Sequence, residues 1–132
     1  MLLLDAALET GSEVAFARVV IDERNPFFQP GRGVPSWLLI ELYAQTAALI
    51  GNKPDARRQT PPGYLLGTRR FACDVEWLAP GIELDLQVKK DYMDAQGMGT
   101  FDCRVIRPAI EAPCKLVVYL PQTSTEQEQA DG

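Results

Sequence analysis

The sequence contains no histidine among its 132 residues. Ser-His-Asp and Cys-His catalytic sites, and metal sites with an imidazole ligand, all require histidine and are therefore excluded. Candidate acid-base groups must be sought among the other titratable side chains.

Cysteine is also scarce, with three residues in the chain. Cys73, Cys103 and Cys114 are odd in number and lie in apolar patterns typical of strands. This placement predicts reduced, buried thiols rather than a disulfide framework.

Long apolar runs and an excess of positive charge are missing as well. No run approaches the roughly 18–20 residues of a membrane-spanning helix, and the apolar start of the chain is interrupted by Asp5. The formal net charge of −5 argues against general nucleic-acid binding, which requires a basic surface. We therefore expect a soluble, cytoplasmic protein without a membrane span.

The composition that is present fits one globular domain, with 46% hydrophobic and 23% charged residues. We assign this domain to residues 1–122. Residues 123–132 carry no apolar side chain larger than alanine, which predicts a disordered tail.

The first half of the chain predicts a strand, a loop and a helix. Residues 13–22 are rich in Val, Ile, Phe and Ala, as in a strand, whereas residues 25–35 hold three prolines and two glycines and must form a loop. Ser36 can cap a helix that ends near Ile50, before Gly51. Its apolar residues cover every side, which is typical of a buried helix.

After a polar loop over residues 52–63, apolar and polar residues alternate with period two. The alternation predicts four strands that each bury one face, at residues 71–77, 82–88, 101–105 and 114–120. Residues 94–97 form the turn between the second and third. The expected fold class is α+β: a curved antiparallel sheet wraps the helix, and a second subunit closes the remaining side.

Glu41 and Gln45 are the polar residues of the helix with most chemical interest, because their spacing of four places them on one face. A carboxylate on a buried helix must be neutralised, hydrogen-bonded or placed in a wet cavity. Glu41 is therefore a candidate acid, although pairing with an arginine or a loop would explain it as well.

The start of the helix offers a second candidate element. Backbone N–H groups near Ser36 and Trp37 are expected to point outward and could hold a thioester carbonyl oxygen. An ordinary serine cap is the simpler interpretation of Ser36.

A group of positive residues lies on or near the loop after the helix and the following strand. Positive residues of this kind ordinarily keep a surface solvated. A more specific alternative is that they dock an acidic or phosphate-bearing carrier. The group consists of Lys53, Arg57, Arg58, Arg69 and Arg70.

Several motifs resemble the β-hydroxyacyl-acyl-carrier-protein dehydratases of fatty-acid and polyketide synthesis, a family with the hot-dog fold. The resemblance covers most of the chain, and it is closer still to the dehydratase-like proteins found with bacterial aryl-polyene synthesis. The motifs are MLLLD at residues 1–5, NPFFQ at 25–29, GVPSW at 33–37, ELYAQT at 41–46, LLGTR at 65–69, LAPG at 78–81 and GTFDC at 99–103.

The resemblance implies a role for several residues. Glu41 falls at the family's catalytic acid, while Ser36, Trp37, Gln45 and Gly67 fall at substrate-binding positions. In the family a loop histidine removes the α-proton, and the histidine and the acid come from different subunits. Here the loop over residues 29–34 has no histidine.

The resemblance therefore implies a homodimer or a heterodimer with a related dehydratase that supplies the histidine to Glu41. The substrate would be a 3-hydroxyacyl group on acyl carrier protein, with no cofactor and no metal. Two alternatives stay open: a non-catalytic acyl-binding or scaffold subunit, and an acyl-thioester hydrolase in which one carboxylate activates water.

Overall fold

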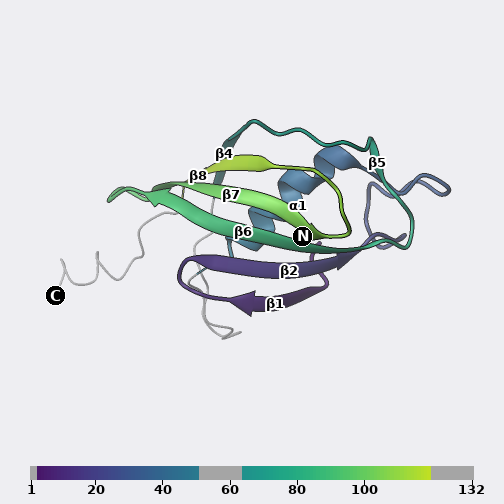
Figure 1. Ribbon diagram of the computed structural model, residues 1–132, viewed down its shortest axis with the longest axis horizontal. Helices are drawn as coiled ribbons and strands as arrows, with labels where there is room; N and C mark the ends of the chain where they lie inside the picture. Colours follow the sequence, from purple (N-terminus) through teal and green to yellow (C-terminus); the bar gives the residue numbers. More distant parts are fainter. Residues whose placement is uncertain (1–2, 51–63, 120–132) are drawn as a thin grey trace.

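A computed structural model describes residues 3–50 and 64–119 of the chain. Within them a long antiparallel sheet lies against a single α-helix (Figure 1). The elements are β1 (Ala6–Thr10), β2 (Val14–Val20), β3 (Val34–Pro35), the 3-10 helix η1 (Ser36–Leu38), α1 (Leu39–Ala47), β4 (Tyr64–Arg69), β5 (Trp77–Leu78), β6 (Glu83–Met93), β7 (Met98–Arg107) and β8 (Cys114–Tyr119).

The main sheet has six antiparallel strands in the order β1-β2-β6-β7-β8-β4. Helix α1 crosses one face of it and contacts β2, β6 and β8. Alternate residues of the four central strands face the helix and are buried, as period-two patterning requires. They are Ala15, Ala17 and Val19 of β2, Leu84, Leu86 and Val88 of β6, Phe101, Cys103 and Val105 of β7, and Cys114, Leu116 and Val118 of β8.

The helix anchors itself in this core through its buried side. Leu39, Leu42 and Tyr43 are fully buried, and the Tyr43 hydroxyl donates a hydrogen bond of 2.7 Å to the carbonyl of Ala112. Burial raises the pKa of Tyr43 far above its ordinary value, so the hydroxyl remains a donor. This bond fixes α1 against the segment that leads into β8.

All three cysteines are free thiols, as the sequence predicted. Cys103 and Cys114 lie opposite each other in β7 and β8, and Cys73 is half-buried. The hydrogen bond with Cys114, together with burial, raises the pKa of Cys103. This thiol is therefore a packing group rather than a nucleophile.

The prediction of a strand at residues 71–77 is right about which side chains face the core, but it is wrong about backbone pairing with a neighbouring strand. The side chains of this segment alternate between half-buried and exposed, yet only Trp77 belongs to a ladder, the short β5 paired with β3. The strand that follows the helix is instead β4, which pairs with β8. Alternating burial needs an extended chain over a core, but it does not need a neighbouring strand.

Strand β1 is absent from the sequence prediction because all five of its residues are exposed. An edge strand without a buried face leaves no apolar alternation to detect. The predicted helix was also too long: α1 ends at Ala47, and residues 48–50 continue as turns.

Gly33 fixes the approach of the pre-helix loop to the β3–β5 ladder. It has φ +98°, and a Cβ atom here would lie 1.8 Å from the carbonyl oxygen of Leu78. Gly31 has φ +81°, but a Cβ atom there would meet nothing within 4 Å. Gly33 is therefore required by both its positive φ and the lack of space for a side chain, whereas Gly31 is required by its positive φ alone.

We expect Gly33→Ala to lower the free energy of unfolding by roughly 3–5 kcal/mol, because strained φ and a backbone clash add together. Gly31→Ala, the matched control, should cost about 1–2 kcal/mol for φ alone. Denaturant unfolding of both variants measures this difference. Equal losses would show that the contact with Leu78 relaxes without cost.

The outer face of the sheet carries a buried carboxylate. Asp85 is 5% exposed and lies beneath Arg18 and Arg107, with Arg18 Nε at 2.8 Å from Asp85 Oδ1 and Arg107 Nη2 at 3.1 Å from Oδ2. The hydrogen bond from Arg18 lowers the pKa of Asp85 below its ordinary value of 3.8. The folded state thus favours the ionised carboxylate.

The stabilisation from Asp85 is present above pH 3.8 and is lost as the pH falls through the lowered pKa of the folded state. Asp85→Asn should therefore reduce the free energy of unfolding at pH 7 and lose this effect progressively in acid. Glu83→Gln is the control, because Glu83 lies 3.5 Å from the same Arg18 with a 57% exposed side chain. Unfolding measured from pH 7 to pH 2 would contradict this account if both variants behaved alike.

Candidate functional site

Helix α1 and the preceding η1 leave one face uncovered in the described chain. Leu38 and Leu39 turn into the core, whereas Trp37 and Glu41, four residues apart, are exposed. We call this surface the open helix face. It consists of exposed Trp37, Glu41 and Ala48 and half-buried Ile40, Ala44 and Gln45.

Glu41 is exposed at the centre of the open helix face rather than enclosed. Within the described residues the sheet covers the other side of α1, so the sequence-based role of Glu41 as an acid stays a prediction. Gln45 Nε2 donates a hydrogen bond to Glu41 Oε2 at 3.2 Å, so the hydrogen-bonded alternative describes this carboxyl group. Residues four positions apart in a helix lie on the same face, so their side chains can reach each other.

Gln45 has a second contact, which comes from the start of the chain. The backbone N–H of Leu3 donates to Gln45 Oε1 at 2.7 Å across 42 residues of sequence. The helical spacing predicted that Gln45 and Glu41 share a face, but no local pattern could have predicted the contact with Leu3.

Ser36 does not cap the helix as the sequence suggested. Pro35 occupies the N-cap position with φ −59° and ψ 140°, and no side chain caps η1. The Ser36 N–H donates to the carbonyl of Glu76 at 2.9 Å, because the β3–β5 pairing continues one residue into the helix start. This amide therefore does not point outward for a substrate, and Trp37 is the next first-turn amide along the chain.

Two aromatic side chains stand at the same helix end. Phe27 and Trp37 meet edge to face, with ring centroids 5.3 Å apart and an interplanar angle of 74°. Both remain exposed, at 45% and 51%. Exposed aromatic pairs of this kind are characteristic of surfaces that bind a ligand or a partner.

The loop before the helix closes on itself. Gln29 and Gly33 exchange backbone hydrogen bonds of 2.7 and 2.9 Å, and the Arg32 amide donates to Gln29 at 3.0 Å. The Arg32 guanidinium lies over the Trp77 ring, 5.3 Å from its centroid. The loop that lacks histidine is thus an ordered turn held against β5.

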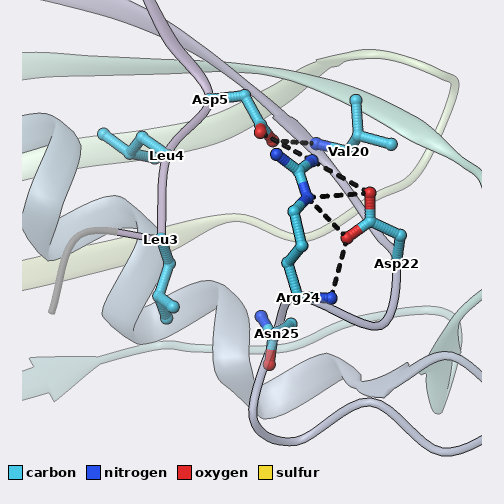
Figure 2. A pocket seen from close by; sticks show the side chains of 7 residues that line it. All are labelled: Leu3, Leu4, Asp5, Val20, Asp22, Arg24 and Asn25. Atoms are coloured by element: carbon cyan, nitrogen blue, oxygen red, sulfur yellow. Dashed lines mark hydrogen bonds and ion pairs between the residues drawn. The ribbon is translucent and has the colours of Figure 1, made fainter.

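A cavity of about 290 Å³ lies between the N-terminal segment and the end of β2 (Figure 2). Arg24 crosses it and pairs with Asp5 and Asp22, each through contacts of 2.8–2.9 Å. The hydrogen bond from Arg24 lowers the pKa of Asp22. Because these charges satisfy one another, the cavity is a structural ion-pair site. It is lined by Leu3, Leu4, Asp5, Val20, Asp22, Arg24 and Asn25.

The remaining predicted site residues are spread over the second half of the chain. Gly67 is a half-buried residue of β4 at a register shift, and Arg70 is exposed just after β4 with φ +59°. The backbone of Arg69 pairs with Lys115. Arg57 and Arg58 lie outside the described residues, so the predicted carrier-docking group stays a prediction.

Metal and membrane features can be assessed for residues 3–50 and 64–119. These residues contain no cluster of three or more potential metal-binding side chains of His, Cys, Asp or Glu. No helix among them has the length and apolar character needed to span a membrane.

Comparisons with known proteins identify relatives of the whole chain. The model of the family described as ApeP-like, ApeP dehydratase, matches residues 1–130. A search among curated proteins finds no match.

Solved structures share the architecture. The dehydratase heterocomplex ApeI:P from Xenorhabdus doucetiae matches with a TM-score of 0.79 and 22% identity, over 99% of this chain and 90% of that chain. An uncharacterised protein from Pyrococcus horikoshii has a TM-score of 0.66 and 16% identity, over 92% and 86%. A mutant thioesterase from Staphylococcus aureus has a TM-score of 0.63 and 7% identity, over 89% and 93%. The expected hot-dog fold is confirmed.

Proposed function

Because this chain belongs to the ApeP-like dehydratase family, we propose that it takes part in eliminating water from 3-hydroxyacyl thioesters on acyl carrier protein. We further propose that it does so in the cytoplasm, in aryl-polyene type synthesis, paired with a histidine-bearing dehydratase subunit. One observation carries the proposal: Glu41 stands on the open helix face of a chain without histidine.

In the proposed reaction the partner's histidine removes the α-proton of the thioester. Glu41 donates a proton to the β-hydroxyl group, the carbon–oxygen bond breaks, and water leaves as the α,β double bond forms. The first-turn amide of Trp37 would stabilise negative charge on the thioester oxygen. Gly67 would line the acyl chain, and Gln45 would contact the site through its hydrogen bond to Glu41. The carrier would be received by Arg57, Arg58, Arg69 and Arg70.

The open helix face supports the need for a partner. A subunit that covers Trp37, Glu41 and Ala44 would bury exposed apolar surface and exclude water from the carboxyl group. Removal from water favours the neutral, proton-donating form of a carboxylic acid. The relative from Xenorhabdus doucetiae is itself described as a heterocomplex, which is the assembly that we propose here.

Glu41→Gln should lower the dehydration rate of the reconstituted complex by about 100-fold or more, because general acid catalysis contributes that much. Mass spectrometry of the carrier-bound acyl group measures the loss of water directly. The complex must be assembled with a histidine-bearing subunit, and the chain alone is the control. An unchanged rate in the complex would exclude Glu41 as the acid.

A non-catalytic scaffold is the second candidate function, and the absence of histidine favours it. In that case the partner contains a complete site, and this chain supplies only the opposing surface. The same Glu41→Gln complex would then keep full activity, which separates the two candidates.

Placing a charge on the open helix face should abolish activity under both candidates, because both need the interface. We expect Ala44→Arg to prevent assembly with the partner, as measured by size-exclusion chromatography. Ala109→Arg is the matched control at an exposed position after β7. Assembly that survives Ala44→Arg would place the interface elsewhere.

Hydrolysis of the thioester is the remaining alternative, since a similar solved structure is described as a thioesterase. Free acid released from the carrier, in place of a carrier-bound enoyl product, identifies it in the same mass spectra.

A further inference from the structure

We infer that the main chain of the N-terminal segment positions the Glu41 carboxyl group, with Gln45 as the positioning residue between them. The inference rests on the proposed role of Glu41 as the acid and deepens it. Its basis is a continuous pair of hydrogen bonds: Leu3 N–H to Gln45 Oε1 at 2.7 Å, and Gln45 Nε2 to Glu41 Oε2 at 3.2 Å.

The backbone donor determines which way the Gln45 amide is turned. A primary amide has an oxygen that only accepts and a nitrogen that only donates, and a backbone N–H can bind only the oxygen. The Leu3 N–H therefore holds the oxygen on its own side, so that the NH₂ group must face Glu41.

The orientation of Gln45 in turn assigns the transferable proton to one atom of Glu41. Oε2 accepts the hydrogen bond from Gln45, so it cannot carry a proton directed at the same nitrogen. In a neutral carboxylic acid the carbonyl oxygen accepts hydrogen bonds better than the hydroxyl oxygen, so this bond favours the proton on Oε1. The acid would protonate the leaving hydroxyl group from Oε1 while Oε2 stays fixed.

The anchor is rigid because the N-terminal segment is attached to β2. Leu4 is 8% exposed and belongs to the core, the Asp5 N–H donates to Arg18 at 2.8 Å, and Val20 donates to the Asp5 carboxylate at 2.6 Å. Figure 2 shows Leu3, Leu4 and Asp5 in succession beside Val20. The position of Glu41 is thereby tied to the sheet as well as to its own helix.

Hydrogen exchange and side-chain NMR test this relay without any catalytic activity. In Gln45→Leu, exchange of the Leu3 amide should accelerate about tenfold, because one hydrogen bond is lost. Gln45→Glu retains an acceptor and should keep that amide protected. Glu41→Ala should shift the Gln45 side-chain NH₂ protons. Unchanged Leu3 exchange in Gln45→Leu, or unchanged NH₂ signals in Glu41→Ala, would overturn the inference.

Kinetics of the reconstituted complex test the consequence for the acid. Both Gln45→Leu and Gln45→Glu should lower kcat by about tenfold with little change in KM, since each removes the donor to Glu41. Gln96→Leu, the same substitution in the exposed β6–β7 turn, should leave both constants unchanged. Wild-type kcat in Gln45→Glu would refute the positioning role.

The two arms separate the inference from the proposed function. If no partner yields dehydration by the wild-type complex, the proposed function fails. The NMR arm still decides whether Leu3 and Gln45 hold the Glu41 carboxyl group.

Discussion

The structure depends on one constraint: in residues 3–50 and 64–119, the sheet covers helix α1 on one side and leaves the other side exposed. Leu42 and Tyr43 are fully buried beneath the four central strands, and the Tyr43 hydroxyl is bonded to Ala112. The opposite side, which carries Glu41, is exposed among these residues. The same packing that stabilises the fold therefore leaves a carboxyl group on a surface rich in small and aromatic residues, which suits a shared site.

The start of the helix is defined by backbone contacts instead of side-chain capping. Gly33 permits the close approach of the loop to Leu78, and the short β3–β5 ladder follows it in the chain. The Ser36 N–H then donates its hydrogen bond to the carbonyl of Glu76. The preceding loop is closed by its own hydrogen bonds and by Arg32 over Trp77. Because this loop has no histidine, the proposed shared site would take its base from the partner.

Much of the fold could be predicted because apolar periodicity reports which side chains face a core. The alternation identified the facing of the strands that became β6, β7 and β8, and even of residues 71–77, which form almost no ladder. Strand β4 was missed because Tyr64–Arg69, with the sequence YLLGTR, shows no strict alternation of apolar and polar residues. Strand β1 was missed for the complementary reason, because it buries no side chain.

The sequence by itself determined the absence of an imidazole base, the α+β class, and the shared helix face of Glu41 and Gln45, since composition and helical spacing are local properties. Only the tertiary structure decided which face of the helix stays open, that the Ser36 amide is occupied, and that Leu3 reaches Gln45. Each of these depends on the path of the chain between distant residues. Such contacts form when packing brings two backbones together, and no periodicity or motif within either segment encodes them.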